Sequence, residues 1–316
     1  MNILLPKAVT ADMFGAGTTI PPVDPYTQEI AWVSGTSYAV KDRRVDGDYV
    51  YECVQAVTTA PQNTYAPSDA RSAAYWKKDE NTPTNRMAPF DRYFYTRARA
   101  LSTMTYVLNP GFITGLALYL DADNLRIKVE DDLGNPLIQP VEEELWEAPF
   151  DEYEYLFGDL KRRRYFSLKG LPLHPSAVVT VTAWRNLPTE EVSIDFLSVG
   201  TWKQFLAPLP NPISGAQYGM EAATRDYSIT EDYQDGTYRE IEGRKATDIS
   251  LTCLIAAEAA PDAMQTLRQV LGKAVAVEVS GLPKYSHLTT VCRLTGKVRS
   301  ISWPHAQVDL QMKGNT

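Results

Sequence analysis

Three histidines are the first side chains to consider for catalysis, because imidazole exchanges protons near neutral pH. They are His174, His287 and His305, and none stands beside a nucleophile motif or a second histidine at metal-binding spacing. His174 lies between Pro172 and Pro175 in an expected loop, and the other two flank expected strands. We therefore interpret all three as surface or turn residues, and we predict no catalytic site and no metal site.

A dense acidic segment could hold the two carboxylates, about 5 to 9 Å apart, that glycoside hydrolysis requires. Aromatic residues are interleaved with the acids, so the interpretation we favour is a segment packed by its aromatics, with its acids outward and paired with the basic run 161–164 that follows. We interpret the basic run as a solvated turn or an internal ion-pair partner. A glycoside hydrolase is the alternative, and it predicts loss of polysaccharide cleavage in Glu143→Gln or Glu147→Gln. The acids are Glu142, Glu143, Glu144, Glu147, Asp151, Glu152 and Glu154, and the aromatics are Trp146, Phe150, Tyr153, Tyr155 and Phe157.

Aromatic side chains in residues 31–82 give a specific binding hypothesis, because an exposed Trp or Tyr ring stacks on the apolar face of a sugar. The alternative is that so small a module needs these rings as its own hydrophobic core. The two interpretations differ in whether the rings are exposed. The candidate carbohydrate-binding residues are Trp32, Tyr38, Tyr51 and Trp76, with Tyr49 and Tyr75 beside them.

Cysteines and glycines offer little further chemistry. Cys53, Cys253 and Cys292 are far apart and lack the C-x-x-C spacing of zinc sites, so we predict reduced, buried thiols. Gly15-Ala16-Gly17 is not followed by the third glycine or the Gly-Lys-Ser/Thr ending of a phosphate-binding loop. We therefore predict no cofactor.

Composition indicates a globular, β-rich protein. The 316 residues suffice for two or three domains, and 44% hydrophobic content excludes wholesale disorder. Many prolines and tyrosines with few helical patterns favour an all-β fold. The net charge is −8 and residues 161–164 are the one basic cluster, so we expect no nucleic-acid partner. The apolar stretch in residues 1–6 is too short for a signal peptide, so we expect synthesis in the cytoplasm. No apolar run reaches about eighteen residues, so we expect no membrane span.

Turn residues and strand patterns divide the chain into four predicted parts, with boundaries at residues 81–89 and at the proline-rich stretch 208–212. Residues 1–30 have little regular pattern, and we expect them to be an arm that contacts something rather than a domain. The parts are an arm at 1–30, a three-stranded aromatic module at 31–82, a β-sandwich at 83–203 and a second β-sandwich with one helix at 204–316.

Expected strands follow the alternation of apolar and polar residues. In the module, an Asp46-Gly47-Asp48 turn leads into a strand at 49–54. In the last part, Ile249, Leu251, Cys253 and Ile255 alternate with polar residues, as do Val308, Leu310 and Met312. The strands expected in the first sandwich are 112–120, 125–130, 177–184 and 192–200.

One convincing helix is expected between these last two strands. Pro261 suits its first turn, Asp262 favours the positive N-terminal end, and Gly272 can end it. Its predicted apolar stripe is Met264, Leu267, Val270 and Leu271.

Two segments resemble known families. The aromatic module, through its Trp-Val-Ser-Gly-Thr-Ser-Tyr stretch at 32–38, residues 46–53 and 66–69, and Tyr75-Trp76, resembles the small chitin- and cellulose-binding modules of hydrolases and phage tail proteins. The following Pro-Thr-Asn-Arg-Met-Ala-Pro-Phe-Asp at 83–91 is similar to the P-T-N-R-W-A-M-F-D segment of tail-associated proteins of long-tailed phages, with Met87 and Pro89 as departures. Such proteins continue into a jelly-roll-like sandwich, and residues 192–200 are similar to its closing strand.

The last third, with Thr237-Tyr238-Arg239-Glu240, looks like the assembly domain of tail tube and distal tail proteins. The resemblance implies a non-enzymatic distal tail or baseplate protein in the tail tip of the virion. It would form a ring with copies of itself, a hexamer or a trimer, and contact tail tube and baseplate hub proteins. Exposed strand edges are templates for such pairing. The alternative is a carbohydrate-binding tail adhesin that recognises host cell-surface glycan.

Overall fold

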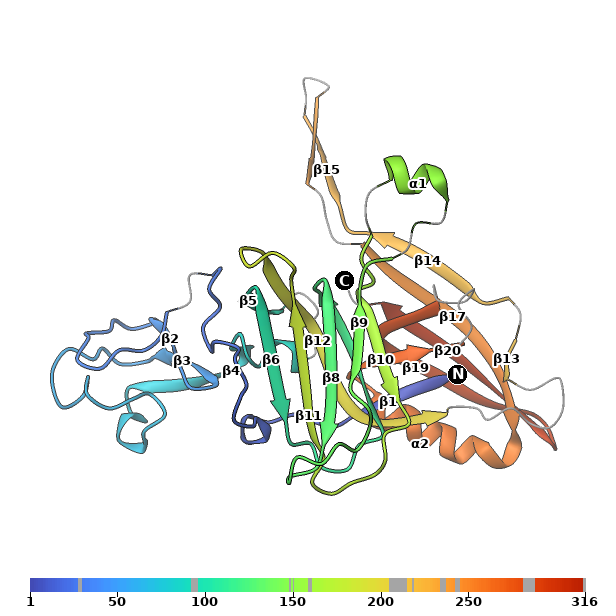
Figure 1. Ribbon diagram of the computed structural model, residues 1–316, viewed down its shortest axis with the longest axis horizontal. Helices are drawn as coiled ribbons and strands as arrows, with labels where there is room; N and C mark the ends of the chain where they lie inside the picture. Colours follow the sequence, from blue (N-terminus) through green and yellow to red (C-terminus); the bar gives the residue numbers. More distant parts are fainter. Residues whose placement is uncertain are drawn as a thin grey trace.

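The fold is all-β, as predicted, with 49% of the chain in strands and 11% helical. In this computed structural model the small module lies at one end, a sandwich in the middle and the C-terminal part at the other end (Figure 1). The predicted boundary at 208–212 lies outside the described residues. The structure describes residues 1–316 except 28–29, 92–95, 148, 150, 159–160, 205–214, 218, 234–236, 242–244, 281–287 and 315–316.

The small module is the predicted three-stranded antiparallel sheet, in the order β2-β3-β4. The predicted Asp46-Gly47-Asp48 turn connects the first two strands. Gly47 adopts φ +61° there, a conformation that glycine reaches without strain. The strands are β2 (Arg43–Asp46), β3 (Tyr49–Cys53) and β4 (Trp76–Pro83).

The middle unit has the strand order of a jelly roll, which confirms that prediction. One sheet runs β5-β12-β7-β10 and the facing sheet runs β6-β11-β8-β9, so two Greek keys interleave. Val179, Val181 and Ala183 alternate along the expected strand 177–184 and are buried between the sheets, and Ala177 is buried as well. The strands are β5 (Ala98–Leu101), β6 (Thr103–Leu108), β7 (Gly115–Asp121), β8 (Asn124–Glu130), β9 (Val141–Glu144), β10 (Tyr165–Lys169), β11 (Val178–Trp184) and β12 (Glu191–Gln204).

The C-terminal part is an antiparallel sheet in the order β18-β19-β20-β17, with β13 and β14 paired along the outer edge of β17. One face carries the alternating apolar residues predicted for β17 and β20, and helix α2 packs on this face. The elements are β13 (Gly215–Ala216), β14 (Glu221–Asp226), β17 (Lys245–Ala256), α2 (Ala260–Val270), β18 (Ala274–Glu278), β19 (Thr289–Ser302) and β20 (His305–Gly314).

Helix α2 forms where the sequence predicted it, but its buried face differs from the predicted stripe. Leu267 and Val270 are buried, whereas Met264 and Leu271 are exposed. Leu271 follows the last helical residue and has a non-helical ψ of 127°, so its side chain does not continue the buried face of the helix. Gly272 then turns the chain with φ +78°. The small side chains Ala263 and Thr266 complete the buried face. The helix therefore approaches the sheet closely.

Strand β1 (Asn2–Pro6) joins the two larger units into one 11-stranded sheet. Residues 1–30 were expected to be an arm, and this part of them lies between β12 and β18, antiparallel to both. Ile3 and Leu4 are fully buried and contribute to two different cores. Gly200 permits the close approach, because a Cβ there would overlap the carbonyl oxygen of Leu5. The jelly roll and the C-terminal part therefore share backbone hydrogen bonds as well as side-chain contacts.

A buried carboxylate adds a polar contact between the same two units. Glu278 of β18 accepts hydrogen bonds from Tyr165 (3.1 Å) and Ser167 (2.5 Å) of β10 and pairs with Lys169. Burial and the neighbouring carboxylate raise the pKa of Tyr165, so its hydroxyl stays protonated and donates. These three donors take the place of water and satisfy the hydrogen-bonding capacity of the buried Glu278 carboxylate.

Candidate functional site

The four candidate carbohydrate-binding residues do not form an exposed platform. Tyr38, Tyr51 and Trp76 are only 3 to 8% exposed, and they form the core of the small module. Tyr38 meets the Trp76 ring edge-on with centroids 5.2 Å apart. Trp32 is half-buried against the same core. A ring inside a core has no free face for a sugar, so the module uses at least three of these residues for its own stability.

A groove of about 630 Å³ lies between the module and the jelly roll, beside the ring of Tyr49. Tyr49 and Phe90 are its aromatic residues, and most of the other lining side chains are polar. One face of Tyr49 is covered by the Lys78 ammonium, 3.4 Å from the ring centroid. The polar lining residues include Asp48, Asp79, Glu80, Asn81, Thr82 and Asp91.

The Pro-Thr-Asn-Arg segment at 83–86 fastens the module to the jelly roll. The Asn85 side chain donates to the carbonyls of Pro21 and Arg99 (2.9 Å each) and accepts from the Arg99 amide (2.8 Å). Arg86 donates to the Ile20 carbonyl and pairs with Asp48 at 3.1 Å. These partners come from the N-terminal segment, the module and β5. The residue types of this segment are therefore explained by a structural role at the junction.

The acidic segment and the basic run that follows it pair with each other and with their surroundings. Glu143 pairs with Arg163 at 3.0 Å, and Glu154 pairs with Lys161 at 2.6 Å. The interpretation of the basic run as an internal ion-pair partner is confirmed.

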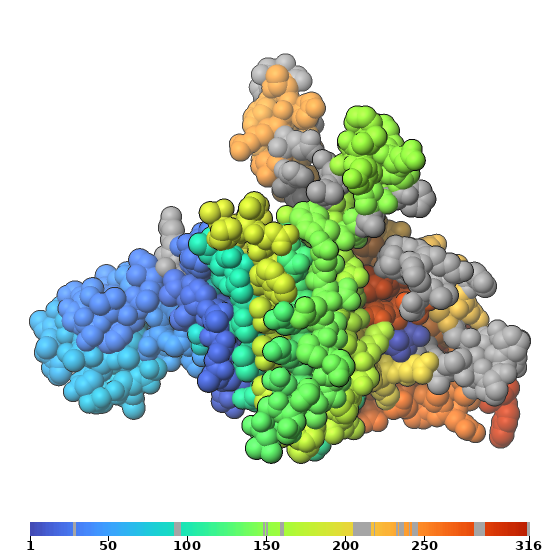
Figure 2. Space-filling view, in the orientation of Figure 1, coloured from blue at the N-terminus to red at the C-terminus, as the bar shows by residue number. Residues whose placement is uncertain are grey.

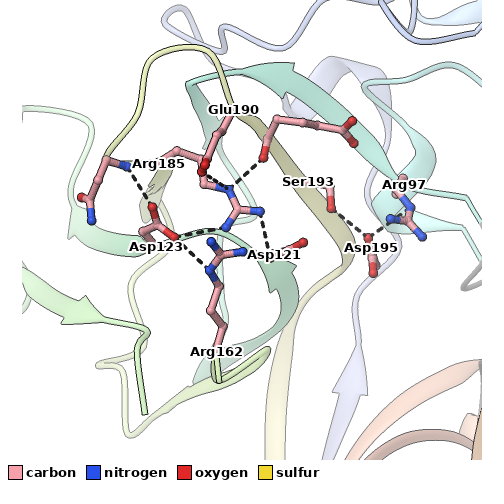
Figure 3. Close-up of polar contacts among 10 residues, drawn as sticks. Arg97, Asp121, Asp123, Arg162, Arg185, Glu190, Ser193 and Asp195 are labelled. Carbon is pink, nitrogen blue, oxygen red and sulfur yellow. Dashed lines mark hydrogen bonds and ion pairs between the residues drawn. The ribbon is translucent and has the colours of Figure 1, made fainter. Parts of the chain in front are cut away.

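Arg162 of the basic run reaches a buried network of charges at the edge of the jelly roll (Figure 3). Asp123 is 3% exposed and lies 3.0 Å from Arg162 and 3.1 Å from Arg185. The buried Arg185 guanidinium also contacts Asp121 at 2.9 Å and donates to the carbonyl of Glu191 at 2.8 Å. Two arginines shared by two aspartates are typical of a structural network, and this one fixes the end of the β9–β10 loop to the sandwich.

A second buried carboxylate lies beside this network. Asp195 accepts a hydrogen bond from Ser193 at 3.3 Å and lies 3.6 Å from Arg97 (Figure 3). Burial raises the pKa of Asp195 above its ordinary value, and the arginine opposes that shift.

The two histidines that the structure describes, His174 and His305, lack the geometry of a nucleophilic site. The Ser176 hydroxyl donates to Asp132 at 2.7 Å and lies 3.3 Å from His174 Nδ1. In a catalytic triad the carboxylate orients the imidazole and the imidazole accepts the serine proton, but here the serine binds the carboxylate directly. His305 lies 3.5 Å from the Ser302 hydroxyl, and His287 lies outside the described residues.

The three cysteines are free and buried, as predicted. Burial raises the pKa of Cys253 to about 12 and raises those of Cys53 and Cys292 as well, which leaves unreactive thiols. Within the part of the chain that the structure describes, no group of three or more His, Cys, Asp and Glu residues could hold a metal ion.

A β-hairpin projects from the C-terminal part as a separate two-stranded sheet (Figures 1 and 2). Its strands are β15 (Ile229–Asp232) and β16 (Tyr238–Ile241). Isolated two-stranded hairpins are marginally stable in water, and this one exposes large apolar side chains. They are Tyr227, Ile229, Tyr233, Tyr238 and Ile241.

The short helix α1 (Glu152–Phe157) projects from the β9–β10 loop of the jelly roll (Figure 2). Four large apolar side chains in this helix are 66 to 75% exposed, and we call them the aromatic knob: Tyr153, Tyr155, Leu156 and Phe157. The Tyr153 and Phe157 rings lie 5.3 Å apart. These aromatics were expected to pack the segment, so their exposure corrects that prediction. A helix of one and a half turns has too little area to bury them against itself.

The turn between β19 and β20 carries the most exposed tryptophan of the described residues. Trp303 is 90% exposed, and Ile301 beside it is 54% exposed. Lys297 and Arg299 precede them on the exposed face of β19. We call these four residues the basic hairpin end. Sequence reasoning missed it, although a Trp-Pro pair in a turn between two alternating strands was a usable signal, since a turn has no core to face.

No helix in the described part of the chain is long and apolar enough to cross a membrane. Comparison of the chain with protein-family models, with curated proteins and with solved structures gave no match.

Proposed function

We propose that this protein is a non-enzymatic structural component of a phage tail tip, a distal tail or baseplate protein. It assembles with copies of itself into a ring and links the tail tube to the host-contacting apparatus. The proposal starts from the resemblance of residues 83–91 and 192–200 to tail-associated proteins. The jelly roll between these two segments supports it as fold-level analogy.

The projecting β15–β16 hairpin is the observation that carries the proposal. A monomeric protein rarely presents a hairpin whose apolar side chains have no core, because exposed apolar area favours association. In an assembly, the same side chains become buried against a neighbouring subunit. Tyr238 and Ile229, both more than half exposed, are the residues that gain most from such burial.

The outer edge of the C-terminal sheet supports the same conclusion. Strand β14 pairs with β17 on one side, and all six of its residues are exposed. An unpaired strand edge is a template for a strand of another chain, and a closed ring removes such edges. The near-balanced charge of residues 201–316 suits an interface with other subunits.

Immunogold electron microscopy with antibody to this chain, on phage particles released from the source culture, tests the proposal. We expect gold at the far end of the tail. Absence of gold, together with absence of the chain from the denatured proteins of the same particles, would refute the virion assignment.

Glycan binding is the second candidate function, and the groove beside Tyr49 is the observation that favours it. The groove combines aromatic rings with carboxylates and amides, which suit the faces and hydroxyls of a sugar. We expect the wild-type chain to be retained on immobilised chitin or host-envelope glycan, Tyr49→Ala to elute freely, and the control Tyr238→Ala to be retained. Elution of the wild-type chain with the void would exclude this function for the glycans tested.

A further inference from the structure

We propose that copies of this chain associate head to tail, with the aromatic knob of one copy packed against the basic hairpin end of the next. The inference deepens the proposed function, because it names the two surfaces that would join neighbouring subunits. It depends on side-chain exposure, charge and placement in the fold.

The aromatic knob is presented by a loop with a fixed base. The Glu147 amide donates to the Lys161 carbonyl at 2.9 Å, and the Arg163 amide donates to the Leu145 carbonyl at 2.7 Å. Between these bonds, the Arg162 guanidinium lies over the Trp146 ring and pairs with buried Asp123. The base of the loop is therefore held by backbone hydrogen bonds, a cation–π contact and an ion pair.

The basic hairpin end offers a complementary anchor. Trp303 stands almost fully in solvent at the end of two long strands, and tryptophan is enriched among the residues that dominate interface energetics. Ile301 extends the apolar area. Lys297 and Arg299 lie behind it on the outer face of β19, away from α2, and Arg293 continues the same row. Asp309 opposes only part of this positive charge, through its ion pair with Arg299.

Charge complementarity selects the second copy as the partner. The loop that carries the knob exposes Glu147, Asp151 and Glu152, whereas the hairpin end is positive. Two knobs would repel each other, and two hairpin ends would also repel, so a symmetric contact of like surfaces is disfavoured. A contact between a knob and a hairpin end brings acidic side chains beside basic ones and packs aromatic rings against each other. It is therefore heterologous.

The two surfaces occupy different parts of the fold. Figure 1 shows α1 at the top of the molecule, whereas β19 and β20 converge at its lower right. A subunit can thus use its knob on one neighbour and its hairpin end on another. Repetition of a heterologous contact produces a ring when the rotation closes, which is the arrangement that the proposed function requires.

Analytical ultracentrifugation of the full chain over a concentration series provides the direct test. We expect wild type to self-associate, and Trp303→Ser or the double variant Tyr155→Ser/Phe157→Ser to weaken association by about 30-fold or more, as for interface hot spots. Leu133→Ser is the matched control, because Leu133 is 84% exposed in a turn outside both surfaces. We expect this control to associate like wild type.

Charge reversal tests the pairing itself. Glu152→Lys and Lys297→Glu should each weaken association, and a chain carrying both should recover most of the loss, whereas the control Lys77→Glu in the small module should have no effect. Mixing Trp303→Ser with Tyr155→Ser/Phe157→Ser should restore association between the two variants, because the intact knob of the first can pack against the intact hairpin end of the second.

A wild-type chain that stays monomeric throughout the series overturns the inference, as does association that is unchanged in Trp303→Ser. Failure of this test is separate from failure of the proposed function. Wild type that assembles through other residues and is found in virions refutes only the knob contact. Wild type that pairs as described and is absent from virions refutes only the tail assignment.

Discussion

Removal of the Asp123 carboxylate is expected to destabilise the jelly roll strongly. The carboxylate is buried between Arg185 and Arg162 and also accepts from the Asn186 amide at 2.9 Å. Breaking a buried pair from one side costs about 3 to 5 kcal/mol, because the remaining charge stays buried without its partner. Arg185 keeps Asp121 as a partner at 2.9 Å, so we expect Asp123→Ala to lie at the low end, about 3 kcal/mol.

An exposed ion pair on the neighbouring sheet provides the matched control. Glu142 and Arg126 lie 2.7 Å apart, with side chains 57% and 43% exposed. Solvent-exposed pairs contribute about 0 to 1 kcal/mol, so Glu142→Ala should change stability little.

Urea unfolding followed by circular dichroism compares the two variants. With a slope of about 2 kcal/mol per molar urea, Asp123→Ala should lower the midpoint of the jelly-roll transition by about 1.5 M. A loss below about 1 kcal/mol in Asp123→Ala, or an equal loss in both variants, would refute the reasoning that burial makes this pair costly to break.

Three further outcomes follow from packing. Trp76→Ala removes a ring from the module core, so we expect a loss of about 3 to 5 kcal/mol and early proteolysis within residues 31–83, with the jelly roll still resistant; resistance equal to wild type would contradict a core role. Because burial raises the pKa of Cys253 to about 12, its thiol stays protonated at pH 8, and we expect alkylation to be slow in the folded chain and complete after denaturation; fast labelling of folded protein would contradict this. Gly200→Ala places a Cβ against the Leu5 carbonyl, so we expect displacement of β1 and faster hydrogen exchange in residues 2–6. Unchanged hydrogen exchange would contradict the close packing of β1 on Gly200.

Local pattern was sufficient for the fold class and for many elements. Alternation of apolar and polar residues depends on neighbours along the chain, and it located β11, β12, β17 and β20 and the small module's β3. The helix ending near Gly272 was equally visible, because Pro261 and Gly272 suit its two ends. The buried cysteines and the internal pairing of the basic run also followed from composition and proximity.

The exposure of the candidate site residues could be determined only from the tertiary structure. A sequence pattern shows that a ring is apolar, but not whether a core covers it; Tyr38 and Trp76 are covered, whereas Tyr155 and Trp303 are exposed. The pairing of β1 with β12 and β18 joins residues about 200 and 275 positions apart, through backbone hydrogen bonds that carry no side-chain signature.

The sequence by itself therefore determined the fold class and the strands with clear alternation, such as β11, β17 and β20, because side-chain periodicity acts locally. Only the tertiary structure decided which strands share a sheet and which apolar side chains are left in solvent, because both depend on long-range contacts between distant segments.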